Sequence, residues 1–153
     1  MVMKSQSSFS PDAASQTSIR TLLVDDSPMM LKLLALILKR AGGFEIVGSA
    51  TNASQALSYV SALSPELVLM DVHMPGMTGI EAIHYLKGQE NPPVVILVTS
   101  DDDPLTRAKA DQAGADRLII KDKNLGDSLV AALRDIFAPF GARSPYSPCA
   151  AQA

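Results

Sequence analysis

Residues Leu67–Gly79 read LVLMDVHMPGMTG, an apolar run that ends at a single acid and continues into a turn-forming segment. The residues Leu67–Met70 are all apolar, which is typical of a strand covered on both faces of a parallel sheet. Pro75 and Gly79 favour a turn after this strand. The stretch therefore predicts a buried parallel strand that carries Asp71 to the edge of a sheet.

The same pattern recurs along the chain, with helical segments between the apolar runs. Five runs are predicted to be strands, four of them almost entirely apolar: Thr21–Val24, Glu45–Gly48, Leu67–Met70, Val94–Val98 and Leu118–Ile120. The first helix begins at Ser27-Pro28, an N-cap followed by a proline, and ends at Gly42-Gly43. The other helices are predicted at Asn52–Leu63, Gly79–Leu86, Pro104–Ala113 and Leu125–Phe137. Five β-then-α units predict an α/β fold, a flavodoxin-like doubly wound (βα)5 domain with a five-stranded parallel sheet.

Composition limits the class of protein. The chain has 153 residues, of which 47% are apolar and 19% charged, with a net charge of −3, so nothing indicates nucleic acid or an anionic membrane as a partner. The single cysteine, Cys149, cannot form an internal disulfide. With no apolar run of membrane-spanning length and no signal-peptide core, the sequence predicts a cytoplasmic protein. We expect one domain at residues 19–137, between a disordered arm at 1–18 and a disordered Pro/Ala/Ser-rich tail at 138–153.

Polar residues follow four of the predicted strands. Asp25 and Asp26 end the first, Asp71 the third, Thr99 the fourth and Lys121 the fifth. In a doubly wound sheet the ligand site lies beyond the carboxyl ends of the strands, so these side chains should meet. Three carboxylates this close need a neutralising cation, and Mg²⁺ prefers oxygen ligands. Three acids, a lysine and a hydroxyl suit phosphoryl transfer.

Four motifs at these strand ends are together similar to those of a known family. They are Leu22-Leu23-Val24-Asp25-Asp26-Ser27, then Leu69 to Gly79, then Val98-Thr99-Ser100, then Ile120-Lys121. In this order and spacing they resemble the response-regulator receiver family, over about Ile19 to Phe137. Each motif alone is an ordinary turn, helix cap or surface residue; the signal is their combination.

The resemblance implies roles for these residues. Asp71 would be the phosphoacceptor, taking a phosphoryl group from a sensor histidine kinase or a histidine phosphotransfer protein. Thr99 would bond the phosphoryl oxygen, and Lys121 would pair with it, and with Asp71 before phosphorylation. A Mg²⁺ site would be formed by the carboxylates of Asp25, Asp26 and Asp71 and the backbone carbonyl of His73. The chain would be a signalling switch, catalysing only its own phosphorylation and autodephosphorylation.

Two positions depart from the family pattern. The family often has a cis proline after the lysine, but here Asp122 follows, so we expect a trans bond and a differently shaped loop. Leu118 stands where the family tends to carry Tyr or Phe as a rotating switch. We therefore expect phosphorylation to cause a smaller repacking of the fourth and fifth helices than in relatives with an aromatic ring.

Other functions remain open at this point. A haloacid-type phosphatase would need a second acid two residues after its nucleophile, and His73 occupies that position. A degenerate receiver acting as a phosphorylation-independent scaffold is disfavoured by the complete set of site residues, and a nucleotide-binding domain by the lack of a glycine-rich loop after the first strand. With no output domain expected after Phe137, the receiver would signal by contact with an unknown target protein, as a monomer or weak dimer.

Two further features suggest interactions. His73 and Asp101 lie two residues after Asp71 and Thr99, and should flank the phosphoryl group and affect its lifetime. Leu31 and Ala35 lie four apart on the predicted outer face of the first helix, and the resemblance implies that this face meets the phosphodonor. The residues predicted to face the sheet are Met30, Leu33, Leu34, Ile37 and Ala41.

Overall fold

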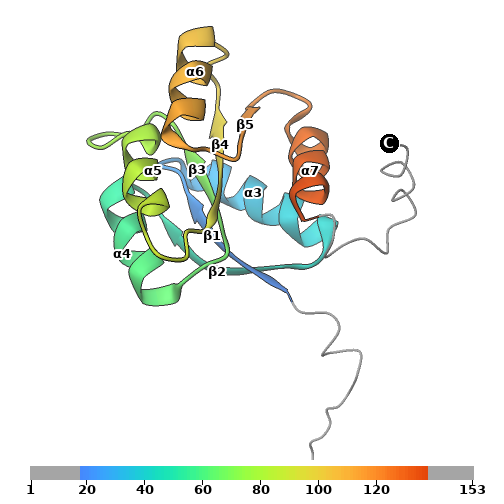
Figure 1. Ribbon diagram of the computed structural model, residues 1–153. Coiled ribbons are helices and arrows are strands. Elements are labelled where there is room, and N and C mark those ends of the chain that lie inside the picture. Colours follow the sequence, from blue (N-terminus) through green and yellow to red (C-terminus); the bar gives the residue numbers. More distant parts are fainter. Residues whose placement is uncertain (1–17, 138–153) are drawn as a thin grey trace, which may run out of the picture.

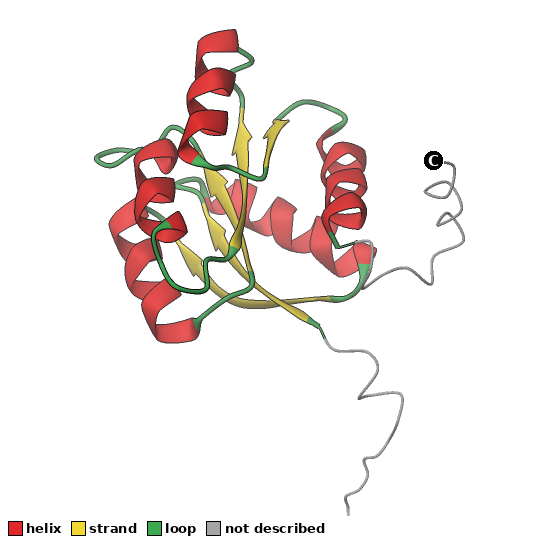
Figure 2. Ribbon diagram, in the orientation of Figure 1, coloured by secondary structure: helices red, strands yellow, loops and turns green. Residues whose placement is uncertain are grey.

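A five-stranded parallel sheet forms the centre of the protein. The computed structural model describes residues 18–137 (Figure 1). The strands are β1 (Ile19–Val24), β2 (Phe44–Ala50), β3 (Leu67–Asp71), β4 (Val94–Thr99) and β5 (Arg117–Ile120), in the order β2-β1-β3-β4-β5. All neighbouring pairs are parallel, so the arrows of Figure 2 run toward one common edge. The predicted fold class is confirmed. The predicted tails lie outside the described residues, except for Ser18. Cys149 also lies outside them.

In the described part of the chain, five helices cover the two faces of the sheet. They are α3 (Pro28–Ala41), α4 (Ala53–Leu63), α5 (Gly79–Lys87), α6 (Pro104–Ala113) and α7 (Leu125–Ile136). The helices α4, α5 and α6 pack on one face, and α3 and α7 on the other (Figure 1). Strand residues alternate between the two cores: Leu22 faces the first and Leu23 the second. All five residues of β3 are buried, which is why this strand has no polar face in the sequence.

Capping residues set the starts of the helices near the carboxyl edge of the sheet. Ser27 Oγ accepts a hydrogen bond from Met30 N at 3.2 Å, and Pro28 opens α3 as predicted. Thr78 and Glu81 form a capping box that starts α5. These caps fix where each loop ends and so hold Asp25, Asp26 and Asp71 in short, defined connections.

The predicted orientation of α3 was wrong at three positions. Leu33, expected in the core, is 40% exposed, whereas Leu31 and Ala35, expected on the outer face, are partly buried against the α3–α7 core. The fully buried pair is Leu34 and Leu38. Because α3 is apolar on almost every side, its periodicity does not define one inner face. The packing of α7 and β2 on either side of the helix decides which residues are covered.

Two helical glycines differ in what their position allows. A Cβ on Gly79, the first residue of α5, would lie 2.3 Å from the carbonyl oxygen of Asp71, whereas one on Gly126 in α7 would make ordinary contact with Ile37 at 3.9 Å. Gly79→Ala should therefore destabilise the protein by about 1–3 kcal/mol through overpacking. Gly126→Ala should change the free energy of unfolding by less than about 1 kcal/mol, toward greater stability.

Urea denaturation of both variants measures this difference. Equal midpoints for Gly79→Ala and Gly126→Ala would show that the close approach of α5 to the end of β3 does not constrain Asp71.

Candidate functional site

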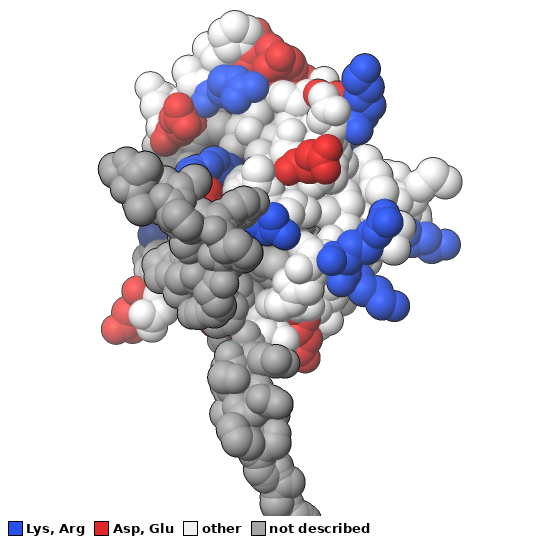
Figure 3. Space-filling view, turned by 90° about the vertical axis from the view of Figure 1, so that its right-hand side faces the viewer, with Lys and Arg blue, Asp and Glu red and all other residues white. Residues whose placement is uncertain are grey.

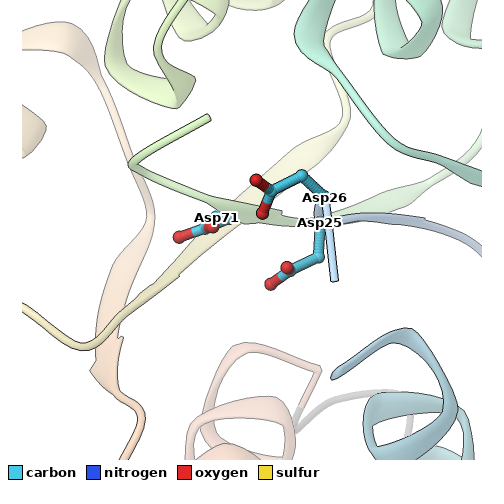
Figure 4. Close-up of side chains that lie close together, drawn as sticks. All are labelled: Asp25, Asp26 and Asp71. Carbon is cyan, nitrogen blue, oxygen red and sulfur yellow. The ribbon is translucent and has the colours of Figure 1, made fainter. Parts of the chain in front are cut away.

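Three carboxylates meet at the carboxyl edge of the sheet. Asp25 and Asp26 directly follow β1, and Asp71 is the last residue of the neighbouring strand β3. One oxygen of each side chain lies within 4.8 Å of the other two (Figure 4). Asp25 and Asp71 are buried, and Asp26 is exposed. The sequence prediction that strand-end acids converge is therefore realised in the geometry.

Lys121 follows the edge strand β5 and contacts two of these acids. Its Nζ lies 2.8 Å from Asp25 Oδ2 and 3.3 Å from Asp71 Oδ1. The lysine was expected to pair with Asp71; it does so, but its shorter contact is with Asp25. Burial lowers the pKa of Lys121, yet the hydrogen bond to Asp25 and the charge of Asp71 outweigh this, leaving the pKa above its ordinary value. Lys121 is thus held charged.

One lysine does not fully neutralise the cluster. Burial raises the pKa of Asp71, and the nearby Asp25 raises it further, although the charge of Lys121 acts in the opposite direction. Among residues 18–137, Asp71 Oδ2 and the carboxylate of Asp26 accept no hydrogen bond. Buried or clustered oxygens without donors are the ligand set that a hard divalent cation prefers. The residues therefore fit a Mg²⁺ ion.

Thr99 places a hydroxyl next to this cluster. It is the last residue of β4, fully buried, and β4 pairs with β3 so that Asp71 lies opposite Val98. Its Oγ1 accepts a hydrogen bond from Asp101 N at 3.1 Å. Within residues 18–137 the hydroxyl donates to no acceptor, so its proton is not engaged by another described residue.

His73 and Asp101 connect the loops that follow β3 and β4. His73 Nε2 lies 3.1 Å from Asp101 Oδ2, and the same oxygen accepts a bond from Thr106 Oγ1 at 3.1 Å. The other oxygen, Asp101 Oδ1, accepts from Asp103 N. The bond with His73, reinforced by the one from Thr106, lowers the pKa of Asp101. The sequence indicated that His73 and Asp101 flank the site, but it gave no sign of Thr106, whose contact depends on the shape of the loop.

A comparison with family models decides the family. Residues 21–134 match the model of the response regulator receiver domain. The chain belongs to the response-regulator receiver family. The match begins within β1 and ends within α7, so it covers the whole of the site described above.

The receiver is similar to parts of several known proteins. It is 32% identical over 118 residues to the transcriptional regulatory protein YdfI of Bacillus subtilis, covering 75% of this chain and 55% of YdfI. It is 37% identical over 139 residues to protein-glutamate methylesterase/protein-glutamine glutaminase 5 of Myxococcus xanthus, covering 85% of this chain and 40% of that protein. The chain thus spans about half the length of the curated relatives it matches.

Solved receiver structures agree with this fold. The signal receiver domain of the putative response regulator NarL from Mycobacterium tuberculosis superposes with a TM-score of 0.73 at 29% identity, over 78% of this chain and 96% of that one. The response regulator domain of CheB from Thermotoga maritima gives a TM-score of 0.70 at 28% identity, over 77% and 95%. Within residues 18–137 of this receiver, no helix is both long and apolar enough to cross a membrane.

Both departures from the family pattern are visible in this receiver. The bond between Lys121 and Asp122 is trans, and Asp122 Oδ1 accepts a hydrogen bond from Asn124 N at 2.9 Å, which shapes the loop into α7. Leu118 is half-buried and packs against the core beneath α4, α5 and α6. At the position where the family tends to carry an aromatic residue, this receiver therefore has an aliphatic side chain that already packs against the core.

Proposed function

We propose that this receiver accepts a phosphoryl group on Asp71 from the phosphohistidine of a sensor histidine kinase or a histidine phosphotransfer protein, and signals by binding a target protein. The observation that carries the proposal is the meeting of three carboxylates with Lys121 at the end of β3. We place this activity in the cytoplasm, where such donors present their histidines.

The proposed reaction is an in-line phosphoryl transfer. An oxygen of Asp71 attacks the phosphorus atom, the bond from phosphorus to the donor's imidazole nitrogen breaks, and that nitrogen keeps the electron pair. Thr99 donates its hydroxyl proton to one phosphoryl oxygen, and Lys121 supplies a positive charge to another. Burial of Asp71 and Thr99 strengthens both interactions because little water screens them.

The carboxylates of Asp25, Asp26 and Asp71 would hold a Mg²⁺ ion, with the backbone carbonyl of His73 as a further predicted ligand. Such an ion would supply positive charge to offset the negative charge of the transferred phosphoryl group. The ammonium group of Lys121 offsets the negative charge of Asp25, whose Oδ2 lies 2.8 Å from Lys121 Nζ.

The pair formed by His73 and Asp101 should control the lifetime of the phosphorylated state. Both oxygens of Asp101 are already engaged, so its proposed role is to hold the ring of His73, two residues after Asp71, where the ring would limit access of water. We expect His73→Ala and Asp101→Ala each to accelerate autodephosphorylation several-fold without preventing phosphorylation. Decay is followed as loss of label after removal of the donor.

Asp102→Ala provides the matched control for this prediction. Asp102 is a neighbouring acid that pairs with Arg107 rather than His73, and its variant should decay like the wild type. If His73→Ala and Asp101→Ala both decay at the wild-type rate, the pair does not guard the site.

The exposed side of α3 near α7 is the proposed docking surface for the phosphodonor. Met29 and Leu33, at 77% and 40% exposure, lie one turn apart there, on the side of α3 where Ile37 approaches α7. This replaces the Leu31 and Ala35 stripe, which is partly buried. Leu33→Glu should slow phosphorylation by a donor protein about tenfold or more, because a charge enters an apolar contact, and leave phosphorylation by acetyl phosphate unchanged.

Leu105→Glu, a change of an exposed leucine on α6, is the control and should affect neither donor. Equal loss with both donors in Leu33→Glu would indicate a folding defect, and no loss with either would exclude this surface.

A further inference from the structure

A second apolar surface lies on the other side of α3, between this helix and the edge strand β2. A groove of about 430 Å³ opens there. Its lining comes from two elements: Lys32, Ala35, Leu36 and Lys39 of α3, and Phe44 and Ile46 of β2. Neither the phosphoacceptor site nor the proposed donor surface uses these residues.

The groove exists because β2 is the edge of the sheet. Within residues 18–137 no strand covers the outer side of β2, and α3 shields only part of its inner face. Leu36 and Ile46 therefore remain 51% and 37% exposed. Phe44 is held in place by edge-to-face contact with Phe137, with ring centroids 6.2 Å apart. The floor is thus apolar and preformed, which is typical of a surface that binds a partner.

The rim of the groove is positively charged. α3 contains Lys32, Lys39 and Arg40, all exposed, and has no acidic residue along its length. Glu45, the nearest acid in β2, alternates with Phe44 and Ile46 and so lies on the opposite face of the strand. α3 ends on the side of the molecule seen in Figure 3, where Lys and Arg side chains gather with few acids between them. The surface is complementary to an acidic partner.

We propose that this groove binds an amphipathic helix of a partner protein that carries two acidic side chains two turns apart, with apolar side chains between them. Lys32 and Lys39 are seven residues apart on α3, a separation of about 10.5 Å along the helix axis. Carboxylates at positions i and i+7 of a second helix have the same spacing. Apolar residues at i+3 and i+4 then face Ala35, Leu36 and Ile46.

Binding in the groove leaves the phosphoacceptor accessible. Phe44 pairs with Ile19 at the start of β1, whereas Asp25 follows the end of that strand, at the other edge of the sheet. Lys39 lies near the end of α3 that is remote from Asp26. The proposed partner is therefore bound whether or not Asp71 is phosphorylated, and the inference stands independently of the proposed chemistry at Asp71.

The test uses the full chain and two synthetic helical peptides of four turns, labelled with a fluorophore. One has Glu at i and i+7 with Leu at i+3 and i+4, and the other has Lys in place of both Glu. We expect fluorescence anisotropy to show binding of the acidic peptide that weakens with salt, and no binding of the lysine peptide. In the double variant Lys32→Glu/Lys39→Glu, the affinity for the acidic peptide should fall about tenfold or more. This variant should bind the lysine peptide instead.

Lys109→Glu, on α6, is the control for net charge, and thermal unfolding checks that each variant is folded. Asp71→Asn should bind the acidic peptide like the wild type. The proposal is overturned if the acidic peptide does not bind, or if it binds Lys32→Glu/Lys39→Glu as well as the wild type. It is also overturned if the protein binds phosphatidylglycerol vesicles but neither peptide, since the surface then serves a membrane.

Discussion

Asp71→Asn should abolish phosphorylation of this receiver. The amide is close in size to the carboxylate but lacks the nucleophilic oxygen, so with Mg²⁺ and acetyl phosphate we expect no incorporated label. The protein should stay folded, because burial already raises the pKa of Asp71 and the folded state therefore disfavours its charge. Removing that charge should leave the thermal midpoint unchanged or slightly higher at neutral pH.

Asp102→Asn is the matched control, since Asp102 is an acid in the same region that lies outside the cluster and pairs with Arg107. It should be labelled like the wild type. Label in Asp71→Asn at the wild-type rate would assign the phosphoacceptor to another residue.

Removal of Mg²⁺ should stop the reaction almost as completely. Lys121 is shared between Asp25 and Asp71, and no donor among residues 18–137 reaches the carboxylate of Asp26. Chelation should therefore leave the phosphoryl group facing unneutralised acids. In the unmodified protein, Mg²⁺ at about 100 times its dissociation constant should stabilise the folded state by about 2.7 kcal/mol.

Asp26→Asn separates this effect from general ionic effects. It removes one proposed ligand at an exposed position, so the fold should be kept while the Mg²⁺-dependent rise in thermal midpoint and the rate of phosphorylation both fall. Asp102→Asn should respond to Mg²⁺ like the wild type. An unchanged Mg²⁺ response in Asp26→Asn would contradict the ligand assignment.

The position of the site could be predicted because it depends on topology. Once the apolar runs are parallel strands, Asp25, Asp71 and Thr99 must come to the same edge of the sheet, whatever the details of packing. The strand β3 was the clearest case. The run Leu67–Met70 is entirely apolar, which predicted a strand covered on both faces, and all five residues of β3 are buried. The helix start at Pro28 followed from local capping chemistry at Ser27-Pro28, which does not depend on distant contacts.

Features that depend on tertiary packing could not be predicted. α3 is apolar on nearly every side, and only the positions of α7 and β2 decide that Leu33 is exposed and Leu31 partly covered. The preference of Lys121 for Asp25 depends on how a long side chain crosses the sheet. The contact of Thr106 with Asp101 requires the turn after Thr99 to bring α6 back toward the site.

Chemical trapping of the phosphorylated residue tests the central claim most directly. Borohydride reduces an aspartyl phosphate to homoserine, and mass spectrometry of the peptides then identifies the residue that was modified. After reaction with acetyl phosphate and Mg²⁺, the account predicts conversion at Asp71 alone. Conversion at Asp25 or Asp26, or a phosphoryl group retained on a serine, threonine or histidine, would contradict it.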